Sequence, residues 1–430
     1  MKRKIYKELI KWKENEDRKP LMLLGARQVG KTWIMQHFGK QEYKKVAYVN
    51  CDDEPRMKQL FDLDYDIERI LMTLQAITGV KVTPGDTLIV FDEIQEVPRG
   101  LHSLKYFCEK APMYHVMVAG SLLGVTLGKG ESFPVGKVDM LSMYPMDYEE
   151  FLYATGHEGW IDILHSKDWT LIETMMPKMV ELLRQYYFVG GMPGVVSKFV
   201  KNADLQQVRT LQHEILEAYG RDISKHTSAS ESVRIRQVMG SLPAQLAKEN
   251  KKFVYGAIRK GSRAKDFELA IQWLLDAGII YKVNRVNEPK MPLKFYEDFD
   301  AFKLFMLDCG LLACMAEAPI DQMLVGNNVF TEFKGMFTEQ YVMQQLKAIG
   351  FTPYYWSNSK SPAEIDFIIQ NDKRVIPIEV KAEENVRARS LSQFVKDNAG
   401  LKGLRISMRG YVDQEWLENI PLVAIDAYFE

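Results

Sequence analysis

The chain has 430 residues, of which 47% are hydrophobic and 26% charged, and its 56 basic and 57 acidic residues almost cancel. This composition excludes a disordered chain, and the balanced charge excludes a global attraction to nucleic acid or to an acidic membrane. The four cysteines form no C-x-x-C pair, which argues against a zinc site and fits free thiols in a reducing cytoplasm. No run approaches the roughly 18 apolar residues of a membrane span, so we expect a cytoplasmic protein without a membrane partner.

The first part of the chain alternates strand-like and helix-like stretches after a charged leading helix. Short apolar runs that read as strands occupy residues 20–25, 44–51, 86–93, 114–121 and 137–146. Buried strands that alternate with helices predict an α/β domain with a parallel sheet covered on both faces.

The remaining residues divide into three further segments. Residues 156–230 read as a helical extension, interrupted by a glycine-rich turn at 190–194. Residues 231–325 read as short helices, a strand and then a hairpin of 292–300 with 301–308, which is the outline of a winged helix. Residues 326–430 begin with a helix and continue as strands and a further helix.

A phosphate-binding loop follows the first strand. Residues 25–32 match G-x-x-x-x-G-K-[ST], with a strand before and a helix after them. Such a loop holds phosphates with backbone N–H groups at a helix N-terminus, while its lysine reaches the β- and γ-phosphates and its hydroxyl binds Mg²⁺. The predicted nucleotide-binding residues are Gly25, Ala26, Arg27, Gln28, Val29, Gly30, Lys31 and Thr32.

The second half of the nucleotide site lies at the ends of two later strands. Asp92 and Glu93 end an apolar strand, where Asp92 would join Thr32 in holding Mg²⁺ and Glu93 would polarise the attacking water. Ser121 ends another strand and would sense the γ-phosphate, although many strands end in serine. No N-K-x-D motif is present, which favours ATP over GTP. Arg99 and Arg221 are candidates for an arginine that completes the site, with ordinary surface arginines as the alternative.

A carboxylate–lysine cluster is predicted near the C-terminus. If a hairpin turns at 372–373, Asp366 faces Glu379, and Lys381 lies two residues further on the same face. Glu339 on the preceding helix would add a third carboxylate. Such a cluster can bind a second Mg²⁺ or a Mn²⁺ ion beside a lysine that orients water. The alternatives are an exposed hairpin with ordinary charges and a nuclease-like fold that no longer cuts.

The segment 246–265 is the most basic window of the chain, with seven basic residues and one acidic residue. We expect contact with duplex or branched DNA through this window, with a solvated helix face or a protein-contact module as the alternative. The candidate DNA-binding residues are Lys251, Lys252, Arg259, Lys260, Arg263 and Lys265.

The chain resembles a poorly characterised family of prokaryotic AAA-type ATPases with a C-terminal region of unassigned function. The motifs that carry the likeness are GARQVGKT (25–32), IVFDEIQEVP (89–98), VAGSLLG (118–124), GGMPGVV (190–196), YGRDIS (219–224) and EIDFII…IPIEVKA (364–382). The C-terminal pattern is similar to the D…E-x-K core of restriction-endonuclease-like proteins, although Ile365 stands where those proteins usually have proline.

The resemblance implies four domains and an ATP-hydrolysing, Mg²⁺-dependent protein. The domains would be a P-loop AAA-like core (1–155), a helical extension (156–230), a winged-helix-like domain (231–325) and a restriction-endonuclease-like domain (326–430). We expect ATP hydrolysis coupled to DNA association, with a C-terminal nuclease-like domain that cleaves DNA. The alternative is an ATP-controlled regulatory or scaffold protein whose nuclease-like domain only binds a protein partner. A homo-oligomer is compatible with either function.

Overall fold

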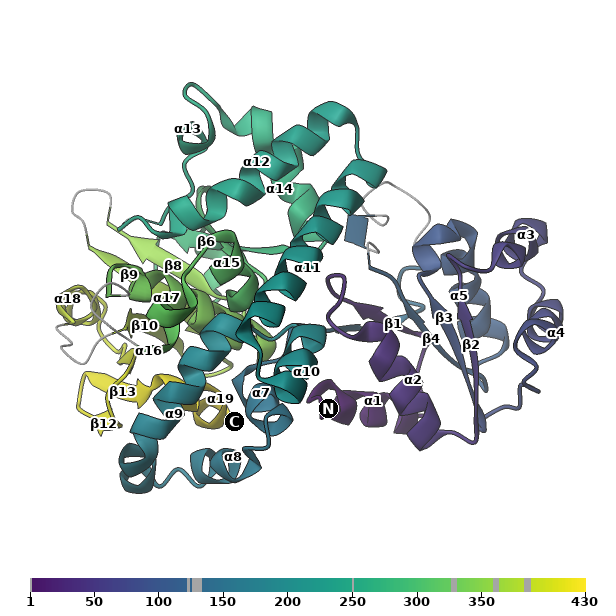
Figure 1. Cartoon of the computed structure of the whole chain (residues 1–430), viewed down its shortest axis with the longest axis horizontal. Helices are drawn as coiled ribbons and strands as arrows, with labels where there is room; N and C mark the ends of the chain where they lie inside the picture. The colour runs from purple at the N-terminus through teal and green to yellow at the C-terminus, as the bar shows by residue number, and fades with distance from the viewer. Residues whose placement is uncertain are drawn as a thin grey trace. The chain divides into compact units, whose positions relative to one another are not determined.

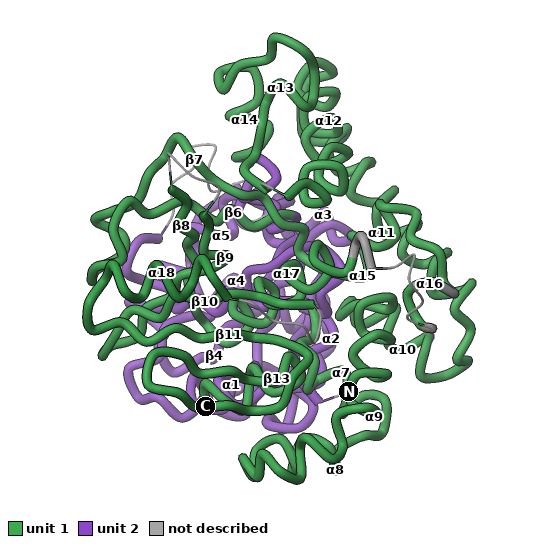
Figure 2. Tube along the Cα trace, turned by 90° about the vertical axis from the view of Figure 1, so that its left-hand side faces the viewer, with its two compact units in different colours: residues 1, 145–272, 280–430 green, residues 2–144, 273–279 purple. Residues whose placement is uncertain are grey.

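The computed structural model describes residues 2–121, 124–125, 134–249, 251–325, 331–358, 363–382 and 388–430. The chain forms two compact units (Figure 2). The N-terminal unit comprises residues 2–144 with 273–279, and the C-terminal unit comprises residues 145–272 with 280–430.

The N-terminal unit is built on a five-stranded parallel sheet with the strand order β2-β3-β4-β1-β5. The strand β4, which ends just before Ser121, therefore lies between the strand that precedes the phosphate loop and the strand that ends in Asp92. The elements of this unit are α1 (Ile5–Glu14), β1 (Leu21–Leu24), α2 (Lys31–Glu42), β2 (Lys45–Asn50), α3 (Pro55–Leu63), α4 (Ile67–Thr78), β3 (Thr87–Asp92), η1 (Ile94–Glu96), α5 (Pro98–Lys110), β4 (His115–Ala119) and β5 (Asp139–Ser142).

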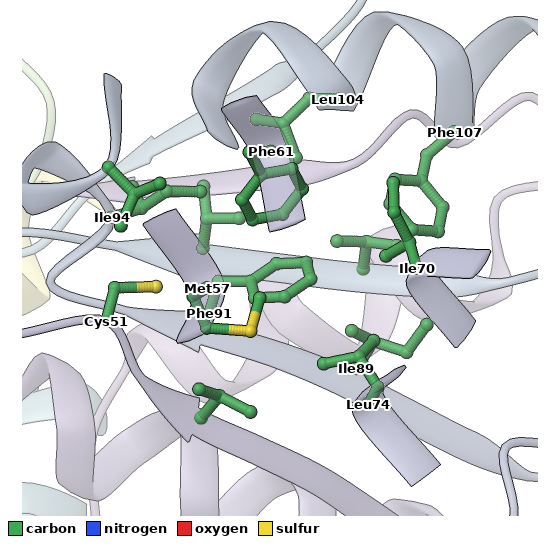
Figure 3. Close-up of a cluster of buried hydrophobic side chains, with 14 of the residues drawn as sticks. Cys51, Met57, Phe61, Ile70, Leu74, Ile89, Phe91, Ile94, Leu104 and Phe107 are labelled. Carbon is green, nitrogen blue, oxygen red and sulfur yellow. The ribbon is translucent and has the colours of Figure 1, made fainter. Parts of the chain in front are cut away.

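Alternate residues of the interior strand β3 pack against helices on opposite faces of this sheet. Ile89 and Phe91 belong to a buried cluster with residues of α3, α4 and α5, including Phe61 and Phe107 (Figure 3). Leu88 lies on the other face against α2, where a Cβ added at Gly39 would be 3.2 Å from its side chain. The predicted parallel sheet with helices on both faces is confirmed, and all five predicted strands are present.

The C-terminal unit combines a run of helices with a mixed sheet (Figure 1). Its first helices are α7 (Tyr148–Ala154), α8 (Glu158–His165), α9 (Trp169–Val189), α10 (Pro193–Asn202), α11 (Leu205–His226), α12 (Ala229–Leu246), α13 (Tyr255–Ile258) and α14 (Ala264–Asp276), the last of which runs into the N-terminal unit. Capping boxes of Asp147 with Glu150 and of Ser228 with Glu231 start α7 and α12 by satisfying the first backbone N–H groups.

Eight strands form the sheet of the C-terminal unit, in the order β12-β13-β11-β10-β9-β8-β6-β7. Its strands and the later helices are β6 (Ile280–Val286), η2 (Leu293–Tyr296), β7 (Glu297–Met306), α15 (Cys309–Met315), α16 (Ile320–Val325), α17 (Thr331–Ala348), β8 (Tyr354–Ser357), β9 (Glu364–Gln370), β10 (Val375–Lys381), α18 (Arg389–Asp397), β11 (Gly403–Ser407), β12 (Val412–Asp413), β13 (Leu417–Pro421), η4 (Leu422–Ala424) and α19 (Ile425–Phe429).

The expected hairpin of 292–300 with 301–308 is wrong. Residues 297–306 form one continuous strand, β7, which pairs antiparallel with β6. The apolar run from Ala301 to Met306 continues a strand that begins in polar residues, so the change in polarity marks where the strand becomes buried and not a turn. Helices α12 to α14 followed by the hairpin β6–β7 keep the order of elements expected for a winged helix, but β6 also pairs with β8. Segments 231–325 and 326–430 therefore share one sheet.

Within the described residues, no helix combines the length and apolar character that crossing a membrane requires.

Candidate functional site

The loop between β1 and α2 has the backbone conformation of a phosphate-binding loop. Gly25 has φ 143° and Gly30 has φ 97°, values that favour glycine. A Cβ at Gly25 would lie 2.3 Å from the carbonyl oxygen of Met143, which follows β5. Gln28 adopts φ 67° at the exposed tip, while Ala26 and Val29 are buried beneath it.

A residue not predicted from the sequence braces this loop. The guanidinium of Arg3 donates hydrogen bonds to the carbonyl of Val29 at 3.0 Å and to that of Tyr144 at 2.7 Å, and the side chain is buried. Arg3 lies just before α1 between Lys2 and Lys4, so its place in a basic run gave no signal of this contact.

Lys31 lies inside the loop. Its ammonium donates to the carbonyls of Gly25 at 2.8 Å and Ala26 at 2.7 Å. Burial lowers the pKa of Lys31 to about 8, although the nearby carboxylates of Glu93 and Asp92 oppose this shift. The predicted lysine and the two predicted carboxylates are therefore close enough to interact electrostatically.

Asp92 receives hydrogen bonds from two hydroxyl groups. Thr32 Oγ1 donates to Asp92 Oδ2 at 2.6 Å, and Tyr48 Oη donates to the same oxygen at 2.9 Å. Burial raises the pKa of Asp92, and the hydrogen bonds from Thr32 and Tyr48 act in the opposite direction. Thr32 and Asp92 thus meet as predicted, whereas the sequence did not indicate Tyr48.

Glu93 and Ser121 also meet. The Oε2 atom of Glu93 accepts hydrogen bonds from Ser121 N at 3.1 Å, Ser121 Oγ at 3.0 Å and Gln95 Nε2 at 2.6 Å. Burial raises the pKa of Glu93, but the hydrogen bonds from Gln95 and Ser121 and the charge of Lys31 outweigh it, so this pKa is lowered. Glu93 has φ 50°, an uncommon conformation for a residue with a side chain.

The donor set beside the loop fits a magnesium ion. Mg²⁺ takes oxygen ligands and typically keeps several waters, with one or two protein ligands and substrate phosphates. The hydroxyl of Thr32 and the carboxylate of Asp92 provide such a pair of oxygens at 2.6 Å from each other.

The two candidate arginines are exposed and have local partners. Arg99 lies over the ring of Tyr65, 5.3 Å from its centroid, and 3.9 Å from Asp62. Arg221 lies 3.6 Å from Glu217 on the same helix. Neither contact assigns a role at the nucleotide site.

The C-terminal hairpin has the predicted register. β9 and β10 pair antiparallel, with Val375 opposite Gln370 and Ile378 opposite Phe367. Asp366 Oδ2 accepts a hydrogen bond from the backbone N–H of Val380 at 2.8 Å. Ile368, on the same face as Asp366, is also buried and belongs to the cluster beneath α18, so this face of the hairpin is partly covered. The pairing of β8 with β9 shifts register near this point.

The predicted carboxylates and Lys381 come together, but two further lysines join them. Lys381 pairs with Glu379 at 2.7 Å. Lys251 forms an ion pair with Glu339, and Lys303 is fully buried, ion-paired with Glu364 and 3.9 Å from Glu339. Burial lowers the pKa of Lys303, but the carboxylates around it outweigh this effect, so the pKa is raised.

Asp366 is the fourth carboxylate of this cluster. Its burial, together with the negative charge of Glu339, raises the pKa of Asp366 to about 7. Over the described part of the chain, no group of three or more His, Cys, Asp or Glu side chains is arranged to hold a metal ion. The second Mg²⁺ or Mn²⁺ ion expected here is therefore not supported, because lysines neutralise the carboxylates.

The basic window separates into two parts. Lys251 was predicted to contact DNA, but its ammonium pairs with Glu339 and its side chain is only 12% exposed. It is therefore not available to DNA in this structure. Lys252 is half-buried, and the exposed residues are Arg259, Lys260, Arg263 and Lys265.

Comparison with protein families gives three separate matches. Residues 17–152 match a family described as an AAA domain, residues 180–322 match a domain of unknown function (DUF8612), and residues 334–428 match another domain of unknown function (DUF4143). Comparison with curated proteins finds no match.

Solved structures that overlap the chain include three proteins of low sequence identity. The Walker-type ATPase PABY2304 of Pyrococcus abyssi is 14% identical with a TM-score of 0.43, over 72% of this chain and 94% of that one. Orc1 of Aeropyrum pernix in complex with DNA is 12% identical with a TM-score of 0.28, over 74% and 91%. Cdc6p of Pyrobaculum aerophilum is 10% identical with a TM-score of 0.25, over 74% and 91%. Structural similarity with TM-scores this low assigns no function to the chain.

The N-terminal unit thus contains an ATPase-like AAA domain with a P-loop, joined to two regions that match families of undescribed function.

Proposed function

We propose that the N-terminal unit hydrolyses ATP with Mg²⁺ and that this hydrolysis is coupled to association with DNA. The observation that carries the proposal is the hydrogen bond from Ser121 Oγ to Glu93 Oε2 at 3.0 Å. Glu93 lies in the same unit as the phosphate loop and interacts electrostatically with Lys31. A loop that only bound nucleotide would not need a carboxylate held in place beside it.

Each side chain of this site has a distinct role in the proposal. The loop amides and Lys31 bind the phosphates, and Thr32 and Asp92 hold the magnesium ion, which offsets negative charge on the phosphates when bound. Glu93, ionised at neutral pH because its pKa is lowered, orients a water and accepts its proton as the water attacks the γ-phosphorus and ADP leaves. Ser121 holds the Glu93 carboxylate through its hydroxyl and backbone N–H.

Two variants test the ATPase assignment. Lys31→Ala should lose nucleotide binding and hydrolysis, whereas Glu93→Gln should keep ATP binding and slow turnover by roughly 10²- to 10⁴-fold, the usual contribution of a general base. Phosphate release and binding of a fluorescent ATP analogue measure the two effects separately. Normal turnover in Glu93→Gln would remove Glu93 from the mechanism, and unchanged binding in Lys31→Ala would refute the phosphate loop.

For DNA, the support is a group of four exposed basic residues that begins just after α13 and ends in the first turn of α14, namely Arg259, Lys260, Arg263 and Lys265. Replacing all four with alanine should weaken duplex DNA binding and flatten its salt dependence, because fewer counterions are released. A matched variant with alanine at four lysines exposed elsewhere (Lys110, Lys167, Lys178 and Lys201) makes the same change in net charge. Equal binding by both variants in a gel shift at several salt concentrations would contradict this assignment.

The C-terminal cluster is compatible with two functions, cleavage of DNA and binding without cleavage, and its ion pairs favour binding without cleavage. Asp366, Glu379 and Lys381 lie at positions similar to a nuclease core, which supports cleavage of DNA. The pairing of Lys251 and Lys303 around Glu339 instead supports a domain that binds without cutting, in an ATP-controlled regulatory or scaffold protein. Cleavage of labelled linear and branched DNA with Mg²⁺ or Mn²⁺, lost in Asp366→Ala, would establish the nuclease; absence of cleavage would support the regulatory protein.

A further inference from the structure

The carboxylate of Asp92 is held from three directions by groups of its own unit. Its Oδ2 atom accepts hydrogen bonds from Thr32 Oγ1 at 2.6 Å and from Tyr48 Oη at 2.9 Å. Its Oδ1 atom accepts one from the backbone N–H of Glu93 at 3.1 Å. The two hydroxyl donors come from different elements, α2 and β2.

We propose that Tyr48 is a positioning residue that fixes the Asp92 carboxylate for the magnesium ion of the ATPase site. This inference rests on the proposed function, because it assigns Tyr48 to the magnesium ion used there. A carboxylate that is held in its binding orientation loses less conformational freedom when the ion arrives, so the ion binds more tightly.

The register of the sheet explains why a tyrosine is needed at this position. Tyr48 lies opposite Val90 in the pairing of β2 with β3, and Asn50 lies opposite Asp92. The Tyr48 hydroxyl must therefore reach two residues along the neighbouring strand, or about 6.6 Å at the usual rise of a strand. Serine or threonine at position 48 would be too short, and phenylalanine would span the distance without a donor.

The hydroxyl of Tyr48 is directed to the site and not needed to fill the core. The side chain of Tyr48 is half-buried, whereas its neighbours Ala47 and Val49 point to the buried cluster beneath α3 and α4. Tyr48→Phe should therefore retain the fold and remove the hydrogen bond to the charged Asp92, together with the contact of the same hydroxyl with Gln36.

Binding of a fluorescent ADP analogue tests the proposal without requiring hydrolysis. In the presence of a chelator, wild type and Tyr48→Phe should bind the analogue equally, because the phosphate loop is unchanged. When Mg²⁺ is added back, the concentration needed for half of the magnesium-dependent gain in affinity should be about tenfold higher in Tyr48→Phe, which corresponds to the lower range for a hydrogen bond to a charged group.

Tyr43→Phe is the matched control. The hydroxyl of Tyr43 lies in the same unit, where it is hydrogen-bonded to His115 Nδ1 at 2.7 Å. This variant makes the same chemical change and should titrate with Mg²⁺ like the wild type.

Three outcomes separate the proposals. Equal magnesium requirements in wild type and Tyr48→Phe would overturn the role of Tyr48, as would a wild type whose affinity for ADP does not respond to Mg²⁺. A wild type that shows the magnesium-dependent gain but does not hydrolyse ATP would overturn the ATPase proposal alone, and the shift in Tyr48→Phe would still support the positioning role.

Discussion

The buried carboxylate of Asp366 should make the stability of the protein depend on pH in a direction opposite to that of a typical ion-paired aspartate. The pKa of Asp366 is raised from 3.8 to about 7 by burial and by the charge of Glu339. Between these two values the folded protein binds a proton that the unfolded chain has released. The contribution of Asp366 to the free energy of unfolding is therefore fully present below the pKa of the unfolded chain and is lost as pH rises through the pKa of the folded protein.

The size of this effect follows from the shift. Each pKa unit corresponds to about 1.4 kcal/mol, and integration from pH 5 to pH 7 gives a loss of about 2 kcal/mol in the free energy of unfolding. Asp366→Asn cannot titrate but keeps an oxygen that accepts the hydrogen bond from Val380 N. Urea denaturation of the full chain at both pH values should therefore show the wild type losing about 2 kcal/mol more than Asp366→Asn.

Asp372→Asn is the control, since Asp372 lies in the exposed turn of the same hairpin. It should follow the wild type at both pH values. If Asp366→Asn also follows the wild type, Asp366 is ionised throughout this range and its pKa is not raised.

Two further variants probe the loop and the cluster. Gly25→Ala should bind nucleotide at least about tenfold more weakly, because its Cβ would lie 2.3 Å from Met143 O and a clash of this kind costs more than the 1.4 kcal/mol of a tenfold change. Gly79→Ala also has positive φ but meets nothing within 4 Å, so equal nucleotide binding by the two variants would refute the steric argument. Lys303→Met should lower the free energy of unfolding by about 3–5 kcal/mol, because it leaves buried carboxylates without their cation. Urea denaturation measures this loss against Lys373→Met in the exposed turn, and a loss equal to that of the control would show that Lys303 is not paired in solution.

The parts predicted from sequence are those in which a local pattern determines the geometry. Short apolar runs between helical stretches gave all five strands of the N-terminal sheet, and the polar turn at 371–374 fixed the register of β9 with β10. The contacts of Thr32 with Asp92 and of Ser121 with Glu93 follow from the ends of parallel strands meeting at one edge of the sheet.

The features of the two sites that the sequence did not predict depend on contacts between segments far apart in the chain. Lys303 is a lysine within the apolar run AFKLFM, and this placement alone could have indicated a buried ion pair, though not its partner Glu364. Lys251 read as a surface charge because its neighbours are basic, and its pairing with Glu339 arises only when distant segments fold together. Tyr48 read as an ordinary strand residue, because its role depends on the neighbouring strand.

The parallel pairing of β6 with β8, with Arg285 opposite Tyr355, joins the two regions that match separate families. A fragment ending near residue 325 would lack β8, so the edge of β6 that pairs with β8 would be exposed. A fragment starting near residue 334 would lack β6, so the edge of β8 that pairs with β6 would be exposed. Unpaired strand edges invite pairing with other chains, so we expect either fragment to aggregate when expressed alone.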